Sequence, residues 1–340
     1  MKIVVDAFGG DNAPLEIIKG CEMAVKELDV DIVLTGDEEA IKKCAKDNGV
    51  SLERMEIVHA PLVMPVEAEY TEVVKSYKES SLAVGLGLLA KGEGDAFVTA
   101  GSTGALVVGS SLIVKRLKGI KRAALGACVP TGNGFYMLMD SGANSECRPE
   151  MLLSFGVMGS AYMQKVAGVE NPRVGLVNNG TEETKGTELQ KEAFAMLKKA
   201  PINFVGNIEA RQLPLNGCDV AVADGFTGNV ILKLTEGMGK LMSNEIKALF
   251  SGSVISKIAA MLVMGSIKKM KKKMDYDEVG GAPLLGISKP VIKAHGSSNA
   301  KAFKNAVRQA KHCVEMDVVG TIKTSMEQYK AAAAEEGSAE

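Results

Sequence analysis

Short apolar runs alternate with longer segments of helical periodicity along most of the chain. Each run is rich in β-branched or aliphatic residues, and the segments between them place apolar residues every three or four positions. The runs that we interpret as strands are Ile3 to Val5, Ile32 to Leu34, Ala96 to Thr99, Met137 to Met139, Val174 to Val177, Asn203 to Val205 and Val220 to Ala223. This alternation predicts an α/β fold with a mostly parallel sheet wrapped by helices.

Most of these runs end in a cluster of Gly, Asp, Asn, Ser or Thr. In open α/β sheets, ligands bind outside the carboxyl ends of the strands, so the clusters are expected to converge on one site. A single cluster is explained equally well as an ordinary turn, but five in register favour a site. They are Asp6–Asp11, Ala100–Gly104, Asp140–Asn144, Asn178–Glu183 and Asp224–Asn229.

Composition excludes several classes of function. The 340 residues include 40 basic and 41 acidic ones, so the net charge of −1 gives no broad basic surface for nucleic acid. Six scattered cysteines without a C-x-x-C pair, together with only three histidines, predict neither a metal site nor a disulfide framework. The chain starts directly in a strand-like run without a signal peptide, so we expect a cytoplasmic protein.

Familiar catalytic motifs are missing. No strand is followed by G-x-G-x-x-G, and neither G-x-x-x-x-G-K-[ST] nor G-x-S-x-G occurs. We therefore expect no cofactor, and covalent catalysis by Ser or Cys has no support in the sequence.

Two helix starts could bind an anion. Gly101, Ser102, Thr103 and Gly104 begin one helix, where free backbone N–H groups can hold a phosphate, although Ser102 or Thr103 would also serve as a plain N-cap. Thr227, Gly228 and Asn229 repeat this design at a second helix start. Lys185 lies at a loop-to-helix junction, where it is either a solvated lysine or a point charge for a phosphate or an oxyanion.

A series of specific motifs runs in order from about residue 2 to about residue 310. The motifs are Asp6–Asp11, Ala100–Ala105, Asp140–Asn144 with Arg148–Glu150, Asn203–Glu209, Asp224–Val230, Gly280–Gly286 and Lys293–Ser298. Together they resemble the PlsX family, the acyl carrier protein:phosphate acyltransferases. One stretch, Val177–Gly186, departs from the family's usual approach to its lysine.

The resemblance implies a two-lobed α/β/α sandwich, similar to phosphotransacetylases and to isocitrate and isopropylmalate dehydrogenases, assembled as a homodimer. We expect one lobe from residues 1–122 with 290–330, a second from 123–289 with a helical arm at 240–274, and a frayed helix end at 331–340. It also implies transfer of a long-chain fatty acyl group from acyl carrier protein to inorganic phosphate, which gives acyl phosphate for phosphatidic acid and phospholipid synthesis. Alternatives are a short-chain phosphate acyltransferase that uses acyl-CoA, a nicotinamide-dependent dehydrogenase and a non-enzymatic scaffold at the membrane surface.

A mechanism follows from these residues as a hypothesis. Phosphate, largely dianionic near neutral pH, sits on backbone amides near Ser102–Gly104 and Gly228 and attacks the thioester carbon directly. Lys185 neutralises the developing charge, with Asn229 and His295 as neutral donors. Further residues are expected to bind phosphate or substrate, and the acids among them to fix loops rather than to carry protons: Asp6, Gly9, Gly10, Asp11, Gly101, Asp140, Asn144 and Thr227.

Two segments suggest contact surfaces. Residues 115–122 hold five cations and no acid, which makes them a docking candidate for the acidic carrier protein, although a solvated helix end explains the same charges. Residues 251–274 combine Ile255, Ile258, Met261 and Leu262 at helical spacing with lysines at the end. Ten uncharged residues cannot span a bilayer, but they can lie in an anionic membrane surface. We favour peripheral contact with the inner face of the cell membrane over an arm that packs only on the dimer partner.

Overall fold

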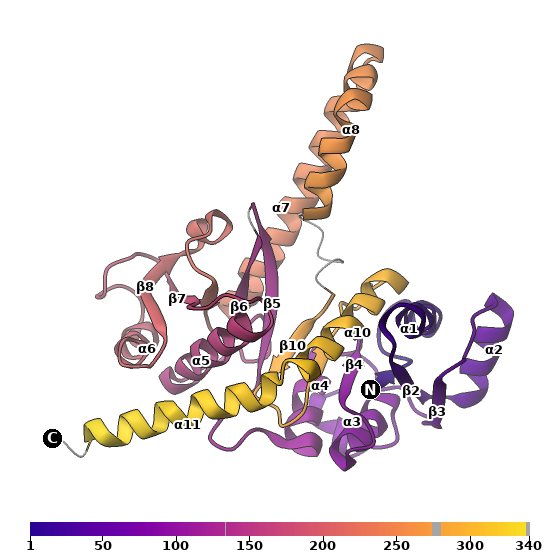
Figure 1. The fold of residues 1–340 in the computed structure, drawn as a ribbon, viewed down its shortest axis with the longest axis horizontal. Coiled ribbons are helices and arrows are strands. Elements are labelled where there is room, and N and C mark those ends of the chain that lie inside the picture. The colour runs from indigo at the N-terminus through magenta and orange to yellow at the C-terminus, as the bar shows by residue number, and fades with distance from the viewer. Residues whose placement is uncertain (133, 274–279, 338–340) are drawn as a thin grey trace.

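One eleven-stranded sheet runs through the whole molecule (Figure 1). The computed structural model describes residues 1–132, 134–273 and 280–337. The strand order is β3-β2-β1-β4-β11-β10-β5-β6-β9-β7-β8. The strands are β1 (Lys2–Asp6), β2 (Asp31–Gly36), β3 (Met55–His59), β4 (Ala96–Thr99), β5 (Ala124–Thr131), β6 (Gly134–Met139), β7 (Arg173–Asn178), β8 (Asn203–Glu209), β9 (Val220–Val222), β10 (Ala282–Leu285) and β11 (Val291–Lys293).

The pairing is mostly parallel, as the alternation of runs and helices predicts. β1 pairs in parallel with β2 and β4, while β5 is antiparallel to both β6 and β10, and β10 is antiparallel to β11. Every run interpreted as a strand coincides with one, although the run at Val220 to Ala223 extends one residue beyond β9. The four strands without a predicted run are β3, β5, β10 and β11, and two of these are only three or four residues long.

Helices cover both faces of the sheet because alternate strand residues point to opposite sides. In β1, Ile3 and Val5 belong to a core shared with α1, α5, α10 and α11, whereas Val4 joins a second core with α3 and α4. The helices are α1 (Leu15–Leu28), α2 (Glu38–Asn48), α3 (Ser81–Lys91), α4 (Thr103–Gly109), α5 (Pro149–Lys165), α6 (Glu188–Lys198), α7 (Gly225–Ser251), α8 (Val254–Lys273), α10 (Ala300–Glu315) and α11 (Val318–Gly337), with short turns η1 (Tyr70–Val74), η2 (Ser110–Lys115) and η3 (Ala210–Leu215).

The last two helices pack on different halves of the molecule. α10 packs on α1, but α11 continues across the molecule and packs on α5 (Figure 1). The segment expected to complete the first lobe thus also covers the second. Helical backbone extends through Gly337, beyond the start of the expected frayed end at residue 331, and residues 338–340 lie outside the described part.

The helical arm starts earlier than the sequence predicts. α7 is continuous from Gly225, beside the polar cluster that follows β9, and turns at Gly252 into α8, so that both helices project from the body (Figure 1). Ile255 and Leu262 on α8 are 80% and 83% exposed, and Ile258 and Met261 are exposed as well. The side chains of residues 268–273, which include the predicted basic cluster, lie outside the described ones. Within the described residues, no helix has the length and apolar character needed to cross a membrane.

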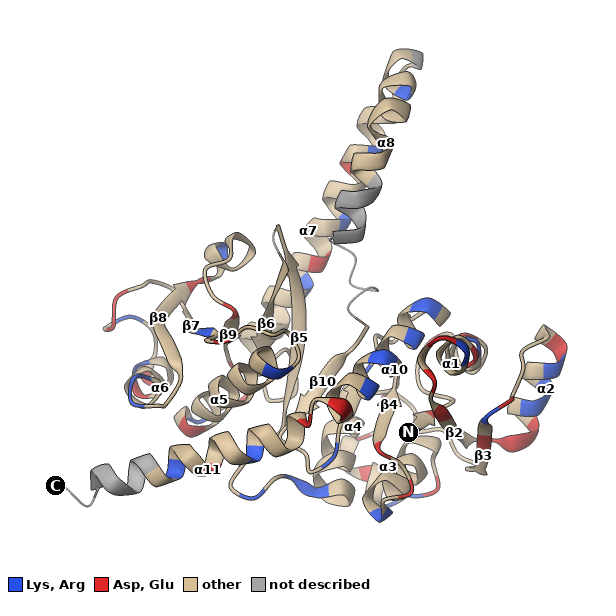
Figure 2. Cartoon of the chain, viewed as in Figure 1, with Lys and Arg blue, Asp and Glu red and all other residues tan. Residues whose placement is uncertain are grey.

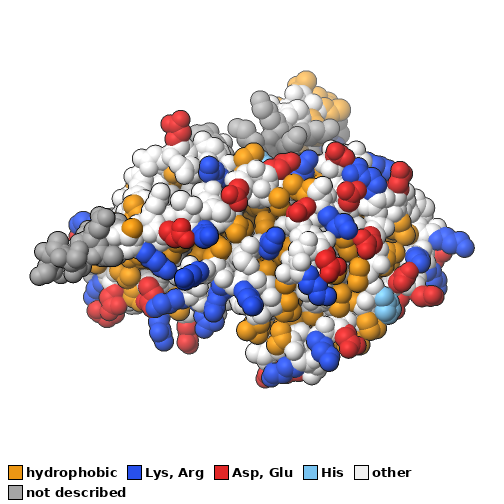
Figure 3. Space-filling view, turned by 60° about the horizontal axis from the view of Figure 1, so that its bottom comes forward, with side chains coloured by type: hydrophobic (Ala, Val, Ile, Leu, Met, Phe, Trp, Pro, Cys, Tyr) orange, Lys and Arg blue, Asp and Glu red, His pale blue; other side chains and the backbone are white. Residues whose placement is uncertain are grey.

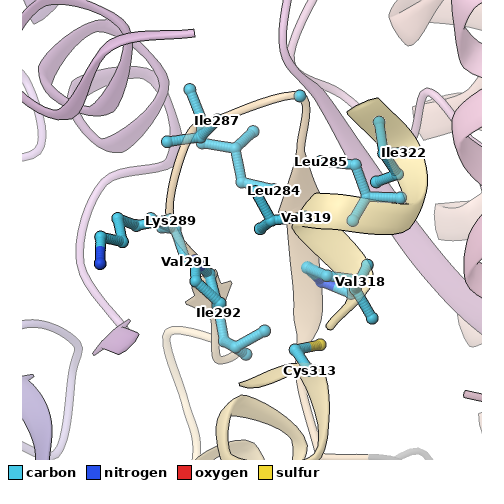
Figure 4. Close-up of a pocket in the computed structure, with 13 residues that line it drawn as sticks. Leu284, Leu285, Ile287, Lys289, Val291, Ile292, Cys313, Val318, Val319 and Ile322 are labelled. Atoms are coloured by element: carbon cyan, nitrogen blue, oxygen red, sulfur yellow. The ribbon is translucent and has the colours of Figure 1, made fainter. Parts of the chain in front are cut away.

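A small gap remains in the core beneath α11. Figure 4 shows apolar side chains of β10, β11 and α11, among them Leu285, Ile292 and Ile322, converging on it, while Lys289 points away. Its volume of about 10 Å³ is close to that needed for one water molecule. We regard it as a packing gap rather than a binding site.

Candidate functional site

Two cavities meet at the carboxyl end of β11. The larger, a cleft of about 590 Å³, lies between the two halves of the sheet, and the smaller, about 410 Å³, lies over the loops that follow β1 and β4. Thr103, Lys293 and Gly296 line both. Polar residues that line the cleft are Thr103, Ser141, Asn229, Lys233, Glu236, Lys293, His295, Ser297 and Ser298.

The smaller cavity brings together seven residues expected from the sequence: Asp6, Gly9, Gly10, Asp11, Gly101, Ser102 and Thr103. Asp6 is buried and accepts hydrogen bonds from the Thr99 hydroxyl (2.7 Å) and the Phe8 amide (3.2 Å). Burial raises the pKa of its carboxyl, although these hydrogen bonds act in the opposite direction. A Cβ at Gly9 would lie 2.6 Å from the carboxylate, so only glycine fits this approach.

The opposite wall of the smaller cavity is apolar. Phe8 and Leu82 contribute to it, together with Val63, Met64 and Val66 from the loop between β3 and η1. Val66 is 68% exposed and Val63 is 49% exposed. A cavity with a polar floor and an apolar wall suits a molecule with a polar head and a hydrocarbon tail.

Both helix starts carry side-chain caps. The Ser102 hydroxyl accepts the amide of Ala105 (3.4 Å), and the carboxylate of Asp224 accepts both the amide and the hydroxyl of Thr227 (2.8 Å each). A Cβ at Gly104 would meet the Tyr70 ring at 2.4 Å, and one at Gly228 would meet the carbonyl oxygen of Asp140 at 1.9 Å. Gly104 and Gly228 therefore allow close packing, and neither lines a cavity.

Asp140 and Asn144 organise a loop instead of facing the cleft. The Asp140 carboxylate accepts the amides of Leu125 (3.0 Å), Ala143 (3.1 Å) and Asn144 (2.7 Å), and Asn144 donates from its side chain to Ala123 (2.8 Å). Burial raises the pKa of Asp140 while these hydrogen bonds favour its charged form. The loop that they fix places Gly142 against Asn229.

Asn229 and His295, two catalytic candidates from the sequence, both line the cleft. His295 follows β11, and its Nδ1 lies 2.9 Å from the Ser297 hydroxyl and accepts the Ser297 amide (3.2 Å). The cleft also contains Cys128, but burial raises the pKa of its thiol to about 12. At neutral pH this cysteine is a thiol, not the reactive thiolate.

Lys185 lies outside both cavities. It is exposed in the loop between β7 and α6, and its side chain packs back toward Gly180. Nine of the fifteen expected catalytic and binding residues thus line the two cavities. The six that do not are Gly104, Asp140, Asn144, Lys185, Thr227 and Gly228.

Lys293 begins one of the family motifs, but it is not among the site residues predicted from the sequence. Its side chain is buried at the last position of β11, and its ammonium donates to the carbonyls of Ala100 (3.2 Å) and Ala294 (2.5 Å). Burial lowers the pKa of this amine to about 8, against the opposing charges of Asp11 and Asp6. Lysine occurs so often at solvated strand ends that only the tertiary structure distinguishes this one.

No group of three or more His, Cys, Asp or Glu within the described ranges could hold a metal ion.

Basic and acidic side chains are interspersed with apolar ones over the face in Figure 3, in keeping with the near-zero net charge. The polar groups of the cleft are hydroxyls, the Asn229 amide, the His295 imidazole, Lys293, and Lys233 paired with Glu236 (2.9 Å).

Comparison with solved structures shows the fold. EutD phosphotransacetylase from Staphylococcus aureus aligns over 96% of this chain and 94% of its own, with a TM-score of 0.58 and 17% identity. A branched-chain phosphotransacylase from Enterococcus faecalis covers 92% of this chain and 99% of its own, with a TM-score of 0.58 and 15% identity. The Rossmann-like α/β/α sandwich predicted from the sequence is confirmed.

Comparison of sequences shows the family. A family model described as "Fatty acid synthesis protein" matches residues 1–321. A phosphate acyltransferase from Caldanaerobacter subterraneus is 50% identical over 96% of this chain and 98% of its own, and one from Thermoanaerobacter pseudethanolicus is 48% identical over the same shares. The chain belongs to the PlsX family of phosphate acyltransferases, enzymes that transfer an acyl group to phosphate.

Proposed function

We propose that this acyltransferase takes a long-chain fatty acyl group from acyl carrier protein and gives acyl phosphate for phosphatidic acid and phospholipid synthesis. One observation carries the proposal: a polar, glycine-lined cavity with an apolar wall opens into a larger cleft beside it. Phosphate fits the polar loops, and a hydrocarbon chain fits the apolar wall that includes Val63 and Val66.

The reaction needs orientation more than it needs a base. Hydrogen phosphate attacks the thioester carbon, a C–O bond forms, and the C–S bond breaks after a tetrahedral intermediate. The proton of hydrogen phosphate ends on the carrier thiol, so the products are acyl phosphate and free carrier protein. Holding both reactants in one cleft can lower the activation free energy by several kcal/mol, since effective molarities of well-oriented groups reach roughly 10⁵ M or more.

We propose that Asn229 and His295 stabilise the oxyanion of that intermediate. They come from opposite halves of the sheet, Asn229 from the first turn of α7 and His295 from the loop after β11, and both line the cleft. Loss of one such donor typically lowers turnover by about 10²–10³. Lys185 keeps the role proposed for it from the sequence only if its loop turns toward the cleft.

Direct attack is favoured over an acyl-enzyme. Cys128 is protonated at neutral pH because burial raises its pKa to about 12. Ser297 lies within hydrogen-bonding distance of His295, but the same Nδ1 accepts the Ser297 amide, so the contact belongs to a tight turn. Ser141 donates its hydroxyl to the Leu125 carbonyl (3.0 Å).

Acyl carrier protein is acidic, so basic surfaces support it as the donor. The basic loop at 115–122 is partly engaged, because Lys121 pairs with Glu150 (2.7 Å) and Arg116 donates to the Lys121 carbonyl (2.8 Å). This basic loop follows α4 and η2, whose first residue, Thr103, lines the cleft, so the loop lies at the end of that helical segment away from the cleft. Figure 2 shows a second row of basic positions along α10, whose first turn lies at the cleft.

Comparison of acyl donors tests the proposal. Purified protein with phosphate is given palmitoyl-carrier protein, palmitoyl-CoA or acetyl-CoA, and acyl phosphate is trapped with hydroxylamine. We expect the palmitoyl-carrier protein to give the highest kcat/KM and Asn229→Ala to remove most of it. Preferred use of acetyl-CoA would replace the proposal by a short-chain phosphate acyltransferase.

The exposed arm supports a homodimer attached to the membrane. Apolar residues recur every fourth position on α7 at Phe226, Val230, Leu234 and Met238, which is the pattern of a helix face that packs on another surface. Those on α8, such as Ile258 and Leu262, lie nearer the end of the arm. We propose that the α7 face contacts the partner subunit and that α8 lies in an anionic bilayer surface.

A further inference from the structure

Lys293 has donor capacity that its protein contacts do not use. A lysine ammonium carries three N–H donors, and here two carbonyls, those of Ala100 and Ala294, accept from it. No carboxylate lies within ion-pairing distance of this ammonium among the residues that the structure describes. The side chain is 9% exposed and lines both cavities, so its remaining donor faces the place where they meet.

The charges around Lys293 come from three elements. Asp6 acts on it from the end of β1, Asp11 from the loop that follows, and Lys233 from α7. The Asp6 carboxylate accepts hydrogen bonds from Thr99 and Phe8. The backbone amide of Asp11 donates to the Gly296 carbonyl (2.8 Å). A buried cation that has only carbonyls as direct partners is costly to keep, and an anionic ligand would offset that cost.

Ser298 provides a second, independent observation in the larger cleft, which Lys293 also lines. Its side chain is 4% exposed, the residue lines the cleft, and its hydroxyl has no hydrogen-bond partner within the described part of the chain. Buried hydroxyls in folded proteins nearly always have a partner, and an anion bound in the cleft would supply the one that Ser298 lacks.

We propose that Lys293 and Ser298 bind the attacking phosphate at the junction of the two cavities, with Lys293 as its direct cation. The inference rests on the proposed function and names the group that holds the nucleophile. Phosphate at the junction lies between the loop of Thr103 and the loop of His295, so one oxygen can point into the cleft that holds the thioester. Lys293 thus orients the nucleophile, and Asn229 and His295 act on the carbonyl oxygen.

Three variants test the assignment. Lys293→Met removes the charge at nearly equal size, and Lys293→Arg keeps it. Lys311→Met is the matched control, because Lys311 also donates to a backbone carbonyl, that of Leu28 (2.7 Å), but on the side of α10 that packs against α1. Each protein is measured for thermal stabilisation by inorganic phosphate without an acyl donor, and for the KM of phosphate and of palmitoyl-carrier protein.

We expect phosphate to stabilise the wild type and Lys311→Met but not Lys293→Met. The KM of phosphate should rise by about 10- to 100-fold in Lys293→Met, as for loss of a hydrogen bond to a charged group, with the KM of the acyl donor little changed. In the wild type this KM should also rise above pH 8 as Lys293 loses its proton, while Lys293→Arg should stay flat from pH 8 to 9.5.

The binding measurement separates the two proposals. Phosphate stabilisation that persists in Lys293→Met overturns the role of Lys293, and its absence from the wild type overturns the whole phosphate site, whatever the enzyme's activity. Phosphate binding that depends on Lys293 in a protein that forms no acyl phosphate overturns the proposed function alone.

Discussion

Replacement of Lys293 by methionine should leave the protein nearly as stable as the wild type at pH 7. The pKa of the buried amine falls from 10.5 to about 8, which corresponds to about 3 kcal/mol spent on keeping it charged. Methionine removes that cost but leaves the carbonyls of Ala100 and Ala294 without this donor, a loss of roughly 1–3 kcal/mol. The two effects nearly cancel, so the net change should stay within about 2 kcal/mol.

The pH dependence gives the sharper result. Between about pH 8 and 10.5 the unfolded chain holds a proton on Lys293 that the folded chain has released. The unfolded state therefore binds more protons, and the stability of the wild type rises with pH in that window. Since one pKa unit is worth about 1.4 kcal/mol, the wild type should gain about 2 kcal/mol relative to Lys293→Met between pH 7 and 9.5.

Urea unfolding followed by circular dichroism at both pH values measures this difference. Subtraction of the two proteins cancels every other group that titrates alike in both. An equal difference in unfolding free energy between the two proteins at pH 7 and pH 9.5 would refute the reasoning. A loss above about 3 kcal/mol in Lys293→Met at pH 7 would also refute it, because such a loss is typical of a buried charge that had a structural partner.

Four other predictions concern the cleft and the arm. Asn229→Ala should lower turnover by about 10²–10³ with little change in the KM of the acyl donor, and an unchanged kcat in steady-state assays would remove it from the oxyanion site. Gly9→Ala should strongly weaken phosphate binding in the thermal-stabilisation assay, since the new Cβ would lie 2.6 Å from the Asp6 carboxylate, and full binding would show that this loop does not shape the site. A double variant with Ile258→Glu and Leu262→Glu should lose flotation with anionic liposomes while sedimenting as a dimer, and retained flotation would reject the membrane role of α8. Lys185→Ala should cost about 10²-fold in turnover if the lysine reaches the developing charge, and near-normal turnover would assign that charge to the cleft residues alone.

The sequence predicts the sheet better than it predicts the site. Buried parallel strands such as β1 and β4 are recognisable by their aliphatic runs. β10 and β11 are too short to show a pattern, and β5 mixes alanine, glycine and cysteine with few branched residues. Four of the five polar clusters contribute residues to the two cavities, but the cluster Asn178–Glu183 contributes none. What the pattern could not tell is which members pack and which face a ligand: Gly228 admits the Asp140 backbone, and Asp140 binds amides of its own loop.

Lys293 shows why the rest requires the fold. In the sequence it is one lysine among many, placed before a His-Gly motif. Its burial depends on β11 pairing with β4, so that Lys293 lies beside Thr99, and on α10 closing over the strand. Those contacts join residues about 200 positions apart, and no local pattern records them.

The most direct test is a single-turnover experiment with excess protein, palmitoyl-carrier protein and either phosphate or no phosphate, followed by intact-protein mass spectrometry and trapping with hydroxylamine. Direct attack predicts that acyl phosphate forms only when phosphate is present and that the mass of the protein never changes. A palmitoyl adduct on the protein in the absence of phosphate, for example on Ser297 or Cys128, would contradict it.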